Sequence, residues 1–126
     1  MNVVDSSGWI EYFTAGSNAS FFADPIEMLE ALVVPSISLL EVFKFVLRRR
    51  DESSALEAIA AMRQGTVVDL DGEIALLAAE WGVEESLPLA DSVIYATALR
   101  EGAIVWTQNR DFRGLPHVRY IEPRKT

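Results

Sequence analysis

The sequence contains no cysteine and only one histidine, His117. The absence of cysteine excludes disulfides, zinc–thiolate sites and thiol nucleophiles. His117 lies in a late segment of the chain, and we expect it to be a solvated or hydrogen-bonded residue rather than a catalytic base. Any acid–base or ligand chemistry in this protein is therefore expected to come from other side chains.

The sequence also has no long hydrophobic run and no basic N-terminal leader. Its longest apolar stretch, residues 31–40, is interrupted by Pro35 and two serines, so it is too short to span a bilayer. No basic region precedes an apolar run near residue 1, which argues against a signal peptide. We therefore expect a soluble, cytoplasmic protein with no membrane contact.

Basic residues are few, and there is no glycine-rich phosphate loop. Eleven Lys and Arg against 19 Asp and Glu give a formal net charge of −8, which disfavours unaided binding to nucleic acid. The basic residues are nevertheless clustered, at residues 48–50 and in a late group comprising Arg110, Arg113, Arg119, Arg124 and Lys125. The first cluster is either a solvated helix C-terminus favoured by the helix dipole or a contact to substrate or partner.

The length of 126 residues fits one domain, residues 1–126, with half of its residues hydrophobic and a core of real size. Short apolar, β-branched runs predict strands at residues 2–4, 32–34, 66–68, 103–106 and 117–121. Helical patterns alternate with them, and Trp9, Trp81 and Trp106 fit core positions. This order predicts an α/β fold with a small, mostly parallel sheet of four to five strands flanked by helices.

Several helix boundaries can be assigned from capping residues. Ser36 or Ser38 is expected to cap a helix that ends near residue 50. Asp71 is expected to cap a helix that Gly82 ends. An earlier helix, within residues 21–32, has its start either near residue 21 or at Pro25.

The most informative residues are four acids that border apolar stretches, Asp5, Glu41, Asp91 and Asp111. A carboxylate in such a place is costly unless something compensates it. In a parallel sheet, ligands bind beyond the carboxyl ends of the strands, where the strand order reverses. Asp5 follows the first strand and Asp111 the fourth, while the other two lie on helices that can point to the same edge. Convergence of the four carboxylates at this edge predicts an oxygen-ligand site for Mg²⁺ or Mn²⁺ that activates a water molecule.

Roles within this site can be proposed from position. Asp5 and Asp91 are the best candidates for direct metal ligands, Asp111 completes the shell, and Glu41 holds a second ion or orients the attacking water. Small hydroxyl residues next to two of the acids, Ser7 and Thr107, are expected to hold a carboxylate or a metal-bound water.

Each acid also has a purely structural alternative. Asp5 could cap the helix that follows it, and Glu41 could pair with Lys44 on an exposed helix face. Asp91 could serve only the N-terminal dipole of its helix. Asp111 could be a turn residue.

Four segments of the sequence together resemble a known family. They are Val-Val-Asp-Ser-Ser at residues 3–7, Ser-x-x-x-x-Glu-Val at 36–42, Leu-Ala-Asp-Ser-Val-Ile-Tyr-Ala-Thr-Ala at 89–98, and Trp-Thr-Gln-Asn-Arg-Asp-Phe at 106–112, followed by Gly-Leu-Pro. In this order and spacing they resemble the PIN domain, and in particular the VapC toxins of type II toxin–antitoxin pairs. The resemblance covers nearly the whole chain.

The resemblance implies a three-layer PIN-like fold and a Mg²⁺- or Mn²⁺-dependent endoribonuclease. It implies catalytic roles for the four acids, metal ligation by Asp5, Asp91 and Asp111, and accompanying hydroxyls at Ser7 and Thr107. One position departs from the pattern, because many relatives have an acid where this chain has Asn109. The missing charge bears on whether a second metal ion binds.

The resemblance also implies partners. These are an RNA substrate, a small VapB-type antitoxin and a second copy of the chain in a homodimer. Basic side chains that could contact RNA or the antitoxin are Lys44, Arg48, Arg49, Arg110 and Arg113. Two other interpretations stay open at this point, a housekeeping PIN nuclease of RNA processing or decay and a non-catalytic PIN-like binding module.

Overall fold

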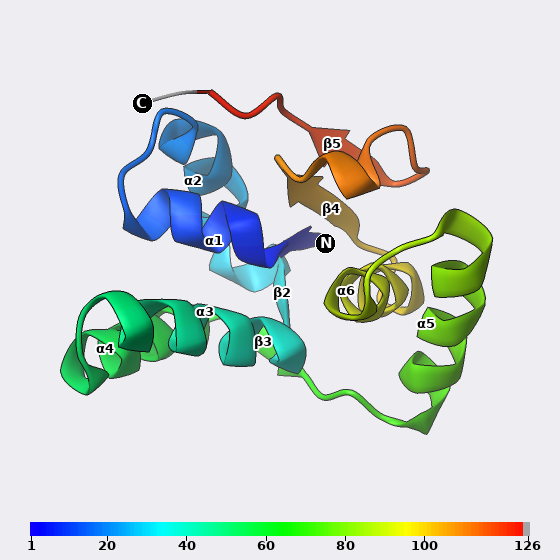
Figure 1. Cartoon of the computed structure of the whole chain (residues 1–126), viewed down its shortest axis with the longest axis horizontal. Coiled ribbons are helices and arrows are strands. Elements are labelled where there is room, and N and C mark those ends of the chain that lie inside the picture. The colour runs from blue at the N-terminus through cyan, green and yellow to red at the C-terminus, as the bar shows by residue number, and fades with distance from the viewer. Residues whose placement is uncertain (125–126) are drawn as a thin grey trace.

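The structure, a computed structural model, describes residues 1–124, and Lys125 lies outside the described residues. Within that range the chain forms a five-stranded parallel sheet with helices on both faces (Figure 1), which confirms the predicted α/β class. None of the helices in residues 1–124 combines the length and apolar character needed to cross a membrane. The strands are β1 (Asn2–Val4), β2 (Leu32–Pro35), β3 (Thr66–Val68), β4 (Ile104–Thr107) and β5 (Val118–Tyr120).

The helices follow the predicted order. They are α1 (Ser6–Phe13), α2 (Ala19–Glu27), α3 (Ser36–Arg49), α4 (Glu52–Met62), α5 (Gly72–Glu85) and α6 (Leu89–Arg100), with short 3₁₀ turns η1 (Leu29–Ala31) and η2 (Arg110–Phe112). In the sheet the strand order is β3-β2-β1-β4-β5. β1 is central, and the chain crosses from one side of it to the other between β3 and β4. The order therefore reverses between β1 and β4, where open parallel sheets bind ligands.

The two faces of the sheet have separate apolar clusters, because successive side chains of a strand point to opposite faces. Val4 and Trp106 pack with helices α1 to α4, in a cluster that includes fully buried Trp9. Val3 and Val105 pack with α6 on the opposite face, where partly buried Trp81 adds to the cluster. The three tryptophans therefore lie in or against the core, as expected.

Of the two starts expected for the helix within residues 21–32, the one near residue 21 is close to the observed start and the one at Pro25 is wrong. α2 begins at Ala19 and contains Pro25, two residues before its end; a missing N–H there costs one hydrogen bond in a helix that is about to stop. Neither Ser36 nor Ser38 caps α3, whose N-cap residue is Pro35. The Ser36 hydroxyl instead accepts a hydrogen bond from the backbone N–H of Leu70 at 3.2 Å.

The predicted end of α5 is also wrong, because Gly82 does not end the helix. The helix continues to Glu85 and ends at Ser86, which has a left-handed φ of 54°. A Cβ at position 82 would lie 3.4 Å from the Cβ of Ser92 on α6, an ordinary van der Waals distance. The N-cap of this helix was predicted correctly, since the Asp71 carboxylate accepts from the N–H of Ile74 at 2.9 Å.

Candidate active site

Asp5 lies directly between β1 and α1 and is 1 % exposed. Its side chain accepts hydrogen bonds from the N–H of Gly8 at 3.0 Å and from the Ser7 hydroxyl, which is 2.9 Å from each carboxylate oxygen. Asp5 therefore does cap α1. The cap does not compete with a role in a site, because the same carboxylate is set at the point where the strand order reverses.

Burial makes the negative charge of Asp5 costly and raises the pKa of its carboxyl from 3.8 to about 6. Repulsion by Glu41 adds to the increase, while hydrogen bonds from Ser7, Gly8 and Thr107 lower the pKa and offset part of it. The chain thus surrounds Asp5 with donors that favour its charged form, yet they do not fully compensate the burial.

Asp91 lies in the first turn of α6. The pKa of its carboxyl is raised from 3.8 to about 7, mainly by burial and also by a hydrogen bond with Asp111 and repulsion by Asp5, Asp111 and Glu41. A surface acid serving only the helix dipole would have a lowered pKa. Asp91 therefore lies near Asp5, Asp111 and Glu41, whose charges act on its carboxyl.

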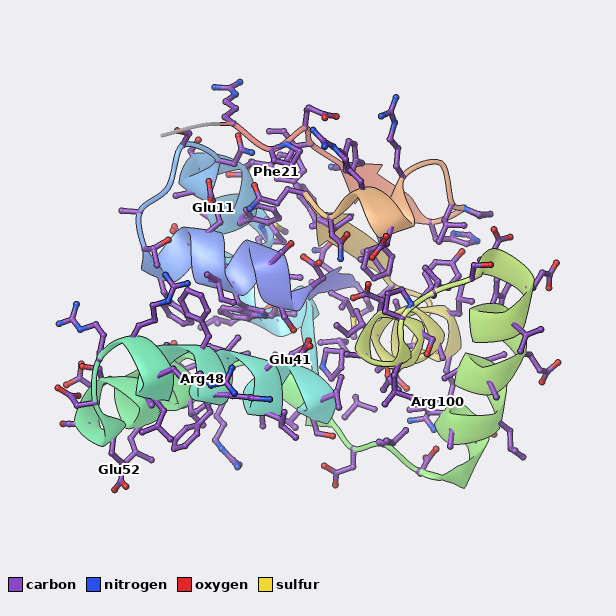
Figure 2. All side chains as sticks on the ribbon, viewed as in Figure 1. Glu11, Phe21, Glu41, Arg48, Glu52 and Arg100 are labelled. Atoms are coloured by element: carbon purple, nitrogen blue, oxygen red, sulfur yellow. The ribbon has the colours of Figure 1, made fainter. Side chains whose placement is uncertain are left out.

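Glu41 lies on α3 and is half-buried. Figure 2 shows it on the side of α3 that faces α1. The Ser6 hydroxyl donates to its Oε1 at 2.5 Å, and within residues 1–124 it forms no ion pair with Lys44, which contradicts that alternative. Ser6 was missed by sequence reasoning. The signal that could have found it is a hydroxyl directly after Asp5, at the first position of a helix.

The loop after β4 is organised by Asn109. Its backbone N–H donates to the Thr107 hydroxyl at 2.9 Å, and its side-chain oxygen accepts from the N–H of Asp111 at 2.9 Å. Its side-chain nitrogen donates to Oδ2 of Asp91 at 3.2 Å. Asn109 rather than Asp111 thus caps the turn η2, which leaves the Asp111 side chain exposed and directed to Asp91.

The donor set fits a hard divalent cation, although the carboxylates are not arranged around a common point. Within residues 1–124, no three His, Asp or Glu side chains are grouped so that they could hold a metal ion without moving. The four acids nevertheless supply only oxygen atoms and repel one another. A divalent cation would relieve that repulsion, and oxygen ligands are those that Mg²⁺ and Mn²⁺ prefer.

Within residues 1–124, no ion pair joins a basic residue to any of the four acids. Lys44, Arg48 and Arg49 are exposed on α3, and Figure 2 shows Arg48 further along that helix than Glu41. The Arg49 guanidinium lies over the Phe45 ring, 4.5 Å from its centroid.

Near β5, Arg110 is paired with Glu122 at 2.8 Å, while Arg113 is exposed. His117 is exposed as predicted.

Comparisons with known proteins agree with this architecture. The structure of a toxin–antitoxin complex from Klebsiella pneumoniae is similar with a TM-score of 0.81 and 22 % identity, over 94 % of this chain and 96 % of that chain. VapC20 from Mycobacterium tuberculosis, a sarcin–ricin loop cleaving toxin, gives a TM-score of 0.75 at 17 % identity, over 92 % and 95 % of the two chains. DNA-bound VapBC from Salmonella typhimurium gives 0.74 at 17 % identity, over 96 % of each.

At these identities the structural likeness establishes the fold. A search by sequence among curated proteins gave no significant match. The sequence pattern of the PIN domain, in contrast, matches residues 3–118. That range includes the four acids, all of β2 to β4 and parts of β1 and β5, and the chain therefore belongs to the PIN domain family.

Proposed function

We propose that this protein is a Mg²⁺- or Mn²⁺-dependent endoribonuclease that acts as the toxin of a VapBC-type toxin–antitoxin pair. The observation that carries the proposal is the convergence of four carboxylates from four segments, with burial and mutual repulsion raising the pKa of two of them. Four carboxylates held near one another destabilise the free protein, and a bound cation would offset their repulsion. Membership of the PIN family and the fold shared with the VapC toxins support the same activity.

In this proposal Asp5, Asp91 and Asp111 hold the cation, and the Glu41 carboxylate accepts a hydrogen bond from the attacking water and orients it. When bound, the ion supplies a lowered water pKa and positive charge next to the scissile phosphate. The Ser7 and Thr107 hydroxyls hold the Asp5 carboxylate.

Asn109 favours one ion rather than two. Its side-chain oxygen is occupied by the N–H of Asp111 and its nitrogen donates to Asp91. Its oxygen thus already accepts one hydrogen bond, and the amide adds no negative charge to the site.

RNA is the proposed substrate, and exposed basic side chains on two sides of the acids support its binding. Lys44 and Arg48 lie on α3, and Arg113 lies after η2. Arg49 and Arg110 belong to the same two groups, but each already has an intramolecular partner. We therefore expect the first three to contribute more to phosphate binding, with a dependence on salt concentration typical of such contacts.

A small VapB-type antitoxin is the proposed inhibitor. A groove of about 670 Å³ lies between the end of α1 and helices α3 and α4, and Phe13, Phe45, Val46 and Ala58 are among its lining residues. An antitoxin segment with apolar side chains fits this groove. An arginine at the end of that segment would form charge-assisted hydrogen bonds with the four carboxylates. Structures of the similar VapBC complexes support the assignment of partner.

We further propose a homodimer of single-domain, cytoplasmic protomers. The outer side of α5 and the start of α6 expose apolar side chains, with Leu76 71 %, Val83 85 % and Leu89 82 % exposed. Exposed apolar side chains on neighbouring helices, as here, are typical of a protein-contact face. Pairing of two copies across it would bury the face and leave the acidic centre accessible.

The function is tested with Asp91→Asn, which keeps the shape of the side chain and removes its charge. With Mn²⁺ present, purified wild type should cleave RNA, and Asp91→Asn should lose roughly 10²-fold or more in rate, because a group that holds the cation is lost. Asp24→Asn is the matched control, since Asp24 is exposed on α2.

Circular dichroism of the two variants checks that both fold. Undiminished Mn²⁺-dependent cleavage by Asp91→Asn would contradict the site. Absence of Mn²⁺ binding to the wild type at millimolar concentration would favour a non-catalytic module instead.

A further inference from the structure

Two consecutive serines at the start of α1 serve different carboxylates. The Ser7 hydroxyl is 2.9 Å from both oxygens of Asp5. The Ser6 hydroxyl donates in another direction, to Oε1 of Glu41 on α3. Successive residues of an α-helix point about 100° apart, so adjacent hydroxyls can reach acids from two separate segments.

The contact between Ser6 and Glu41 joins two elements that are far apart in the sequence. Ser6 is 9 % exposed, and 35 residues separate it from Glu41. A hydrogen bond from a hydroxyl to a carboxylate is charge-assisted and is both shorter and stronger than one between neutral groups. The 2.5 Å separation is of this kind.

No other side chain in residues 1–124 forms a hydrogen bond or an ion pair with the Glu41 carboxylate. Lys44, one turn further along α3, is exposed and forms no ion pair with Glu41. Asp5 and Asp91 repel the Glu41 carboxylate. Without the Ser6 hydroxyl, the flexible Glu41 side chain would therefore be repelled by the other acids and would move toward solvent.

We propose that Ser6 is a positioning residue that holds the Glu41 carboxylate in the acidic centre, so that it acts on RNA hydrolysis through Glu41. This inference rests on the proposed nuclease function. Among residues 1–124, the Ser6 side chain is hydrogen-bonded to Glu41 and to none of the expected cation ligands Asp5, Asp91 and Asp111. Its loss should therefore reduce the rate of the chemical step more than the affinity for RNA.

The test compares Ser6→Ala, Ser6→Thr, Glu41→Gln and the double variant Ser6→Ala/Glu41→Gln. Ser6→Ala should lower kcat by about 10-fold or more with little change in KM, because a misplaced catalytic group costs rate rather than binding. Ser6→Thr keeps the hydroxyl and should restore most of kcat. In the Glu41→Gln background, Ser6→Ala should cause little further loss. Ser20→Ala, at an exposed serine on α2, is the control.

A second measurement does not depend on activity. In a metal-free crystal structure of Ser6→Ala, the Glu41 carboxylate should have moved away from α1, and an unchanged Glu41 position would overturn the proposal. If the wild type is active and Ser6→Ala keeps full kcat, the role of Ser6 is overturned while the nuclease function stands. The same holds if the reductions in kcat of the two single variants multiply in the double variant. A wild type that is inactive with Mn²⁺ would overturn the proposed nuclease function, and the role of Ser6 in it.

Discussion

At the scale of single residues, Asp5 has two roles with opposite effects on stability. Its side chain caps α1 through the N–H of Gly8, which stabilises the helix. Its charge is buried, and the pKa of its carboxyl is raised to about 6. An asparagine at this position would keep the oxygen that accepts from Gly8 and would remove the charge.

Asp5→Asn is therefore expected to stabilise the metal-free protein while abolishing activity. A pKa raised from 3.8 to about 6 corresponds to up to about 3 kcal/mol of destabilisation at neutral pH, which the variant would recover in part. Urea unfolding in EDTA at pH 7.5 measures the difference. Asp24→Asn, with the same change of side chain on an exposed face of α2, should unfold like the wild type. A less stable Asp5→Asn would show that the cap needs the charge.

The same pKa shifts predict a dependence on pH. In the folded protein the carboxyls of Asp5 and Asp91 have a raised pKa, so the folded state binds more protons than the unfolded state between about pH 4 and 7. Over that range the free energy of unfolding should fall as the pH rises. Melting temperatures in EDTA from pH 4.5 to 8 should show the fall in the wild type. The melting temperature of Asp91→Asn should fall less steeply with pH. Equal slopes for the variant and the wild type would contradict the raised pKa of Asp91.

The residue scale also shows which parts of the site sequence can predict. Asp5 follows the end of a predicted strand, and Asp91 lies in the first turn of a helix introduced by proline. Both positions can be read from the sequence, and both predict a carboxylate at the edge of the sheet. Ser6 could not be predicted with its partner, because Glu41 is 35 positions away and the contact depends on how α1 and α3 pack. The hydrogen bonds of Asn109 likewise depend on a turn whose geometry only the structure gives.

At the scale of elements, the start of α1 is constrained by Gly8. A Cβ built there would lie 2.6 Å from the Phe22 ring and 2.7 Å from Cγ1 of Val4. α1 can therefore approach β1 and α2 only with glycine at this position. Because Gly8 also donates to Asp5, a shift of the helix would disturb the site.

Gly8→Ala is expected to destabilise the protein by about 1–3 kcal/mol through overpacking, and to lower activity. Gly72→Ala is the matched control, since no atom lies within 4 Å of a Cβ built at Gly72, at the start of α5. That variant should be neutral or slightly more stable, because alanine reduces the entropy of the unfolded chain. Chemical denaturation compares the two, and equal stabilities would contradict the close packing inferred for Gly8.

Elements were predicted in the correct order, and the errors lie at their boundaries. Glycine often ends helices, but Gly82 lies inside α5, which continues to Glu85. Pro25 often marks a helix start, but here α2 has already begun and is about to end. In both cases local propensity pointed to one boundary and the folded chain has another.

At the scale of the whole molecule, the site lies between two parts of the core. Asp5 caps α1 and Glu41 lies on α3, helices whose buried side chains pack mainly on one face of the sheet, whereas Asp91 lies on α6, which packs on the other. The cation would therefore join elements from both sides of the sheet. Because β1 and β4 contribute side chains to both clusters, we expect the two faces to unfold together as one domain.

This expectation is tested by unfolding in urea, followed by tryptophan fluorescence and far-UV circular dichroism. Trp9 and Trp106 belong to one cluster and Trp81 packs against the other, so variants that keep only Trp81 or only Trp9 report on each face. Coincident transitions are expected for both faces and for the helical signal. Mn²⁺ should move all of them to higher urea by the same amount, because it binds only the folded state. Separate midpoints, or a shift by Mn²⁺ at one face alone, would show that residues 1–124 contain two units and that the metal site belongs to one of them.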